Sequence, residues 1–233
     1  MIYCISDIHG NYKAYKKLLE KINFSDKDTL YVLGDVIDRG SGSIKILQDM
    51  MMRPNVIPII GNHEYMAINC LKFLMQEISR ESISLLDENI IIGLLEWLNV
   101  GGQATIEEFH KLSLKEKQEI IDYIQEFSIY EELTVGDKDY ILVHAGLGNY
   151  SPQKDIEDYS LEELIWDRTD YDVQYYDDVY VVTGHTPTQR ILNNPNPGFI
   201  FRKNNHIAID CGSCFSGGRL GAICLDTGEE FYA

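Results

Sequence analysis

The sequence has few basic residues and no long apolar run, and each shortage excludes a class of protein. Lysine and arginine number 20 against 37 aspartates and glutamates, which gives a formal net charge of −17. Such an excess of negative charge repels DNA and RNA, so we expect no nucleic-acid partner. No stretch approaches the roughly eighteen apolar residues that a membrane-spanning helix needs, so we expect no membrane segment.

Cysteine is also scarce, and its placement argues against a secreted disulfide scaffold. The five cysteines are odd in number and scattered. Cys211 and Cys214 form a C-x-x-C pair, but no second pair follows at the spacing of a zinc ribbon, so we expect reduced thiols in or near the core. The chain opens on an apolar strand, MIYCIS, and not on the basic and apolar segments of a secretion signal. We therefore expect a cytoplasmic protein.

Apolar and amphipathic stretches alternate through the first third of the chain. Predicted strands cover residues 2–6, 29–34 and 55–61, and predicted helices cover residues 12–22 and 43–51. This order predicts parallel strands joined by helical crossovers.

The rest of the chain divides into a helical stretch followed by strands. Residues from about 64 to 127 read as a mostly helical inserted segment, with a glycine break at 100–105 and a clear amphipathic helix at 112–127. Later predicted strands cover residues 130–135, 139–146, 179–185, 206–210 and 220–226, and Gly136–Asp137 signals a hairpin between the first two. No linker rich in proline, glycine and serine divides the 233 residues. We expect one domain, residues 1–233, in which two sheets pack together with helices outside.

Side chains that can bind a metal follow the predicted strands. These candidates are Asp7, His9, Asp35, Asn62, His144 and His185. Sites in parallel sheets are built at the carboxyl ends of strands, so we expect these groups to converge. Imidazoles with carboxylates suit a pair of divalent ions such as Mn²⁺, Fe²⁺ or Zn²⁺, bridged by an aspartate and sharing a hydroxide nucleophile.

The segment GDVIDRG, residues 34–40, adds an arginine to this chemistry. Arginine beside a metal-activated nucleophile predicts an electrophile with forked anionic oxygens, which means a phosphate. Here Asp35 would bind metal and Arg39 would hold phosphoryl oxygens. Asp38 is left to orient an acid or base, and His63 is the candidate: the pair would protonate the leaving alkoxide.

Five motifs in a fixed order carry a resemblance to a known family. They are SDIHG (6–10), GDVIDRG (34–40), GNHE (61–64), HAG (144–146) and GHTP (184–187). In this order they resemble the phosphoprotein phosphatases, a family within the calcineurin-like metallophosphoesterases, and above all its bacterial and phage λ-type members. The match runs from Ser6 to Gly212. The resemblance implies an α/β fold, a β-sandwich of two mixed sheets flanked by helices.

The resemblance also implies a role for each motif residue. It assigns Asp7 and His9 to a first metal, Asp35 to the bridge, and Asn62, His144 and His185 to a second metal. It makes His63 the catalytic acid, oriented by Asp38. It assigns the substrate phosphate to Arg39, to Arg168 in the segment IWDRTD (165–170), and to Asn62. Ser6 stands where the family usually has glycine.

The activity expected from this resemblance is metal-dependent hydrolysis of phosphoric monoesters. We expect a serine/threonine protein phosphatase that acts on phosphoproteins or phosphopeptides with two divalent ions, manganese first among them; activity on phosphotyrosine stays open. The enzymatic alternative is a dinucleoside polyphosphate hydrolase acting on diadenosine tetraphosphate. In relatives of that kind, the motif that corresponds to GDVIDRG tends to lose the aspartate matching Asp38 or to continue as RGP. The motif that corresponds to GNHE ends in aspartate there. The segments DRGS and GNHE of this chain therefore favour the phosphatase. A catalytically silent binding module would have lost a ligand or His63, and this chain has lost neither.

Overall fold

Two five-stranded sheets form the centre of the molecule, and both contain parallel and antiparallel pairs. The computed structural model describes residues 1–75 and 88–233. The first sheet has the strand order β10-β9-β1-β2-β3 and the second the order β4-β5-β6-β8-β7. The first is built from β1 (Ile2–Ile5), β2 (Thr29–Leu33), β3 (Val56–Ile59), β9 (Gly221–Cys224) and β10 (Glu230–Tyr232). The second is built from β4 (Tyr130–Val135), β5 (Lys138–Val143), β6 (Val179–Thr183), β7 (Phe201–Lys203) and β8 (His206–Ala208).

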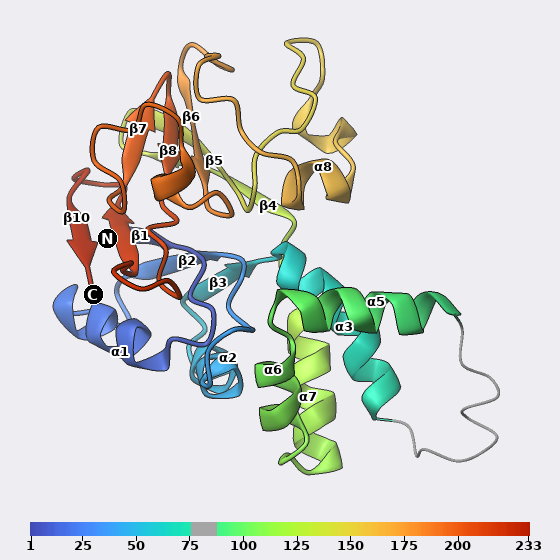
Figure 1. Ribbon diagram of the computed structural model, residues 1–233. Coiled ribbons are helices and arrows are strands. Elements are labelled where there is room, and N and C mark those ends of the chain that lie inside the picture. The colour runs from blue at the N-terminus through green and yellow to red at the C-terminus, as the bar shows by residue number, and fades with distance from the viewer. Residues whose placement is uncertain (76–87) are drawn as a thin grey trace.

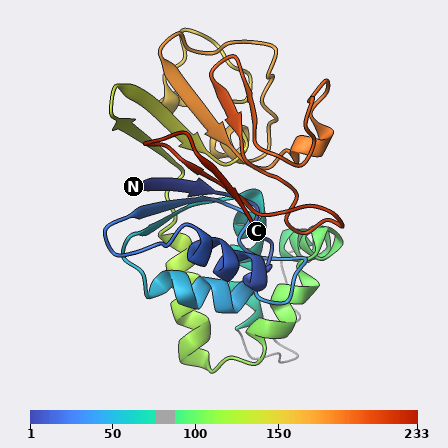
Figure 2. The ribbon, with the colours of Figure 1, turned by 90° about the vertical axis from the view of Figure 1, so that its left-hand side faces the viewer.

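Helices cover the outer face of the first sheet. In Figures 1 and 2 the second sheet lies above the first, and most helices lie below both. The helices are α1 (Tyr12–Lys21), α2 (Ser43–Met51), α3 (Asn62–Leu74), α5 (Glu88–Val100), α6 (Gln103–Phe109), α7 (Leu114–Gln125) and α8 (Leu161–Ile165), with short 3-10 turns at Ile156–Asp158 and Thr188–Arg190. This is the predicted α/β arrangement of two mixed sheets flanked by helices.

The side chains of the first sheet alternate between two cores, as the two-residue period of a strand requires. On β1, Tyr3 and Ile5 belong to the cluster shared with the helices, whereas Cys4 belongs to the cluster between the sheets. The cluster between the sheets joins Cys4 and Leu33 to Leu142 and Val182 of the second sheet. The two sheets are therefore held together by a buried apolar layer.

Most predicted elements are present, and the differences lie in short or glycine-rich stretches. Strands β1, β2 and β3 pair in parallel in the expected order, and β4 pairs with β5 as the predicted hairpin. The glycine break separates α5 from α6. Strands β7 and β10, of three residues each, were not predicted. Part of the predicted helical segment and of the predicted single domain, residues 76–87, lies outside the described residues.

Two further expectations can be compared with this architecture. All five cysteines fall within the description and form no disulfide; four are buried and Cys214 is half-buried. Among the described residues, no helix combines the length and the apolar character needed to cross a membrane.

Candidate active site

The predicted metal ligands converge where strands of both sheets end. Asp7 and His9 follow β1, Asp35 follows β2, and Asn62 begins α3 directly after β3. The second sheet supplies the other two candidates, since His144 follows β5 and His185 follows β6. Backbone hydrogen bonds join the loop after β1 to the loop after β2. The Asp7 N–H donates to Gly34 O at 3.1 Å, and the His9 N–H donates to Asp35 O at 2.9 Å.

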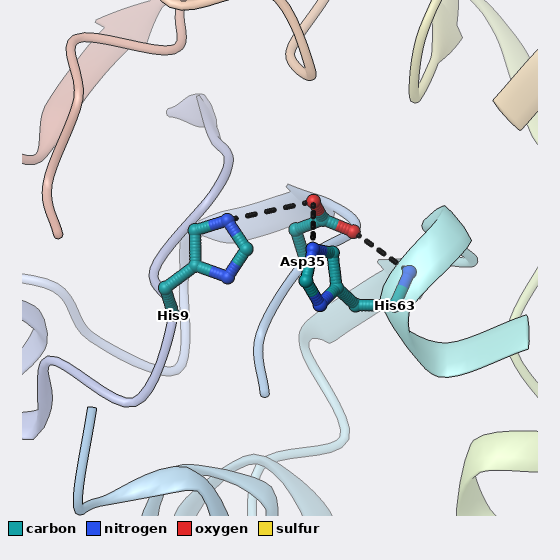
Figure 3. A group of neighbouring side chains, drawn as sticks. All are labelled: His9, Asp35 and His63. Carbon is teal, nitrogen blue, oxygen red and sulfur yellow. Dashed lines mark hydrogen bonds and ion pairs between the residues drawn. The ribbon is translucent and has the colours of Figure 1, made fainter. Parts of the chain in front are cut away.

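Three buried side chains form the first cluster, which Figure 3 shows. Oδ2 of Asp35 lies 3.5 Å from Nε2 of His9 and 3.8 Å from Nε2 of His63. Asp7 lies at the edge of this group, with Oδ1 3.9 Å from Nε2 of His9. Within this group Nε2 of His9 and the carboxylate of Asp35 are the atoms that would hold a cation, because Nε2 of His63 is the candidate proton donor beside them.

The second cluster forms on the other oxygen of the same aspartate. Oδ1 of Asp35 lies 3.4 Å from Nε2 of His144, and Asp35, His144 and His185 form a second group able to hold a cation. Oδ1 of Asn62 lies 3.0 Å from Nε2 of His144 and 3.0 Å from Nδ1 of His185. Because its two oxygens face different clusters, Asp35 has the geometry of a bridging carboxylate.

Backbone carbonyls orient two of the imidazoles. Nδ1 of His9 lies 2.9 Å from Ile37 O, and Nδ1 of His144 lies 2.7 Å from Leu33 O. Each Nδ1 is thereby held by a carbonyl oxygen that only accepts, and Nε2 is the ring atom of each histidine that faces its cluster. Carboxylate oxygens and imidazole lone pairs are ligands that Mn²⁺, Fe²⁺ and Zn²⁺ accept, and the residues present therefore fit a divalent metal.

Burial and neighbouring charges set the protonation of these ligands. Burial lowers the pKa of His9 and of His185 to about 3, so both are neutral at pH 7. Burial, reinforced by the negative charge of Asp35, raises the pKa of Asp7 to about 8. Burial also opposes the ionisation of Asp35. The surrounding imidazoles, above all those of His63 and His144, have a larger opposite effect, so the pKa of Asp35 is lowered.

His63 and Asp38 form the predicted pair. Nδ1 of His63 lies 2.6 Å from Oδ2 of Asp38, and both residues are buried. Burial lowers the pKa of His63, but the carboxylates of Asp35 and Asp38 more than offset it and raise the pKa above its usual value. Asp38 thus holds Nδ1 of His63, and Nε2, which faces Arg39 at 3.0 Å, is the atom that would pass a proton to a leaving group.

Two residues of the helical segment complete the surroundings of Asp38, and sequence reasoning missed both. Trp97 of α5 donates its indole N–H to Oδ2 of Asp38 at 2.6 Å. Thr105 of α6 donates its hydroxyl to Oδ1 at 2.6 Å. The glycine break between the two helices was the one available signal, because Gly102 lies against the Trp97 ring with no room for a side chain.

Glu64 holds backbone groups around the site. Its carboxylate accepts hydrogen bonds from the N–H groups of Asp35, Val36, Ile37 and Gly61 at 2.8 to 3.2 Å. The side chain is fully buried, and burial raises its pKa to about 7. Glu64 thus fixes the loop that carries Asp35. These backbone contacts explain why a glutamate stands at this position. The structure gives no support to reading Glu64 as evidence for a phosphatase over a dinucleotide hydrolase.

The two predicted phosphate-binding arginines lie on opposite sides of the metal ligands. Arg39 has Nη1 2.7 Å from Nε2 of His9 and Nη2 3.0 Å from Nε2 of His63. Arg168 donates from Nη1 to the hydroxyl of Thr186, next to His185, at 3.1 Å. Arg39 therefore contacts histidines of the first cluster, and Arg168 is held next to a residue that adjoins a histidine of the second.

A family model identifies the family of this chain. Residues 1–202 match the model described as calcineurin-like phosphoesterase. The chain therefore belongs to the calcineurin-like metallophosphoesterases. The site is that of a metal-dependent phosphoesterase.

Individual relatives divide between two activities. A symmetrical bis(5'-nucleosyl)-tetraphosphatase of Delftia acidovorans is 34% identical over 100 residues, covering 42% of this chain and only 36% of that enzyme. Serine/threonine-protein phosphatase 2 of Escherichia coli K12 is 30% identical over 171 residues, covering 71% of this chain and 66% of that protein. The chain thus spans about a third of the first relative and two thirds of the second.

A solved structure agrees with the fold. A protein described provisionally as a diadenosine tetraphosphatase superposes with a TM-score of 0.68, covering 100% of this chain and 92% of its own, at 16% identity. At this identity the likeness concerns the fold alone.

Proposed function

We propose that this chain hydrolyses dinucleoside polyphosphates, with two divalent ions held by the two clusters around Asp35. The sequence analysis placed this activity second to protein phosphatase. The first matching relatives, symmetrical bis(5'-nucleosyl)-tetraphosphatases, support the opposite order. The preference for phosphatase rested partly on Glu64, which the geometry explains through the backbone of the Asp35 loop.

The observation that carries the metal-dependent reaction is the position of Asp35 between two ligand clusters. When bound, the metals would supply positive charge to phosphoryl oxygens and lower the pKa of water. We expect manganese, with iron or zinc as alternatives, since the ligands are imidazole and oxygen.

Side chains of this protein would bind the phosphate and transfer the proton. Arg39 and Arg168 would bind the phosphoryl oxygens and neutralise charge that develops on them. Water adds to phosphorus as the bond from phosphorus to the leaving oxygen breaks. His63, oriented by Asp38, would give a proton to that oxygen when it leaves as a strong base.

A protein phosphatase is the second candidate, with phosphoprotein or phosphopeptide as substrate. The specific observation in its favour is the similarity to the Escherichia coli serine/threonine phosphatase, which extends over more of this chain than the tetraphosphatase similarity does. The His63–Asp38 pair also suits an alkoxide leaving group.

A comparison of substrates distinguishes the candidates. Protein stripped of metal and reloaded with Mn²⁺ is given diadenosine tetraphosphate and, in parallel, phosphoserine, phosphothreonine and phosphotyrosine peptides. We expect ADP from the dinucleotide at a kcat/KM at least tenfold above that for any peptide. Faster release of phosphate from a peptide would reject the first candidate in favour of the second.

A further inference from the structure

An exposed phenylalanine lies beside the phosphate-binding arginine. The Phe215 ring is 41% exposed, in the loop between β8 and β9. The Arg39 guanidinium lies 5.8 Å from the ring centroid, and the Arg190 guanidinium lies 5.6 Å from it. A ring this close to the site, with much of its apolar surface open to solvent, is available to a ligand that the arginines attract.

The loop that carries this ring is attached to the site. Ser213 accepts hydrogen bonds from the Asn11 side-chain amide through its carbonyl oxygen at 3.1 Å and its hydroxyl at 3.2 Å. Arg39 donates to Sγ of Cys214 at 3.4 Å. The Phe215 N–H donates to Gly212 O at 2.9 Å, and the Gly218 N–H donates to Phe215 O at the same distance. The ring is therefore placed by the same residues that adjoin the metal ligands.

A pocket of about 470 Å³ adjoins this loop and leads to the first cluster. Its lining includes His9 and Arg39 at the cluster, Cys214 from the loop, and Tyr12 and Lys13 at the start of α1. Arg39 and Lys13 bring positive charge to this pocket, and Arg190 brings a further guanidinium to the Phe215 ring, in a molecule whose net charge is −17. This local charge suits a chain of phosphates, and the neighbouring aromatic ring suits the base attached to that chain.

We propose that Phe215, flanked by Arg39 and Arg190, is a nucleobase subsite. A base stacks on the ring while the diphosphate attached to it lies along the arginines toward the metal ligands. This inference rests on the proposed dinucleotide substrate, but it concerns the binding of a nucleoside diphosphate and can be tested without turnover.

The test is calorimetric titration of the Mn²⁺-loaded protein with ADP and with methyl diphosphate, which carries the same phosphates without a nucleoside. Base stacking on an aromatic residue changes affinity by about tenfold or more. We expect wild-type protein to bind ADP about tenfold more tightly than methyl diphosphate. Phe215→Leu should bring the ADP affinity down to that of methyl diphosphate, whereas Phe215→Trp should preserve the difference.

Phe199→Leu is the matched control. Phe199 also lies near a guanidinium, that of Arg219 at 3.9 Å, but its ring packs on Arg219 and Tyr232, which are not site residues. It should leave both affinities unchanged. The proposal is overturned if Phe215→Leu weakens both ligands equally, which would mean that the ring only supports Arg39, or if it weakens neither.

The two hypotheses fail in different ways. Retained preference for ADP without cleavage of diadenosine tetraphosphate would reject the proposed reaction and keep the base subsite. Cleavage of the dinucleotide with no contribution from Phe215 would keep the reaction and reject the subsite.

Discussion

At the scale of single residues, the site is built on backbone conformations that most amino acids avoid. Asp7, His9, Asp35, Asp38, Arg39 and His185 all have φ between 48° and 73°. Every other non-glycine residue with positive φ among those described is an asparagine; asparagine, aspartate and histidine tolerate this region better than most residues, and Arg39 is the exception. Such strain persists only where surrounding bonds fix it, so it marks the residues whose side chains must point into the site.

The first prediction at this scale concerns His63. The Asn variant keeps a polar side chain but cannot donate an acidic proton, so we expect turnover of a phosphoserine peptide to fall by about 10² to 10⁴-fold. Nitrophenolate leaves without protonation, so turnover of p-nitrophenyl phosphate should fall much less. Steady-state kinetics on both substrates measures the difference, and equal losses would remove His63 from the role of acid.

A second residue-scale prediction concerns Glu64. Glu64→Gln places an amide donor among backbone N–H groups, and Glu64→Asp shortens the reach by one methylene. We expect each to lower the free energy of unfolding by about 1 to 3 kcal/mol, because buried N–H groups lose their acceptor. Urea denaturation measures this loss.

A matched control for Glu64 lies on α7. Glu116 also accepts hydrogen bonds at a helix start, but on an exposed turn, so Glu116→Gln should lower the free energy of unfolding much less than either Glu64 variant does. Equal costs at the two positions would contradict the role assigned to Glu64.

At the scale of elements, helices α5 and α6 supply side chains to the His63–Asp38 pair. Helix α5 packs against α3, as Figure 1 shows, and α6 packs against α2. Trp97 and Thr105 bring the inserted segment into contact with Asp38. Helices α5 and α6 therefore help to fix the position of Asp38 beside His63.

The corresponding prediction is that Trp97→Phe affects catalysis more than binding. The variant keeps most of the buried ring but removes one donor from the Asp38 carboxylate. We expect kcat to fall by about tenfold with KM nearly constant, together with a loss of about 1 to 3 kcal/mol in unfolding free energy. Trp166→Phe, at a tryptophan that is 39% exposed, is the stability control and should change the unfolding free energy little. A larger change in KM than in kcat would show that Trp97 serves binding instead.

The elements also show how far the sequence could predict the structure. Strand β1 and the ligands that follow it were predictable because a buried strand ending in Asp7 and His9 is a local pattern. Strands β7 and β10 have three residues each, too few to show the alternation of apolar and polar residues that predicts a strand. Trp97 could not be assigned, since its contact with Asp38 joins residues 59 positions apart. Glu64 was recognised as part of a motif. Its role as acceptor for four backbone N–H groups could not be predicted, because the folded chain brings those groups to it.

At the scale of the whole molecule, the site joins the two sheets. The first sheet carries Asp7, His9 and Asp35, and the second carries His144 and His185. A metal that binds both sets links the two layers. Metal binding should therefore stabilise the fold as a whole, because it favours the folded state by mass action.

We accordingly predict that Mn²⁺ at about 100 times its dissociation constant raises the melting temperature by about 5 to 10 °C over protein in chelator. At one fixed Mn²⁺ concentration, chosen for pH 8.5 and kept at pH 6, the increment should be larger at pH 8.5 than at pH 6. Asp7, with its pKa raised to about 8, holds a proton at pH 6 that a metal must displace. Scanning calorimetry measures both values, and an increment that falls as pH rises would contradict this assignment of Asp7.

The most direct test of the central claim, a metal centre organised around Asp35, is anomalous X-ray scattering from crystals grown with Mn²⁺. We predict two anomalous peaks, one within bonding distance of His9 and Asp35 and the other within bonding distance of Asp35 and His144. A crystal of the Mn²⁺-loaded protein with no peak at Asp35, or with peaks that contact only one of its two oxygens, would contradict the account.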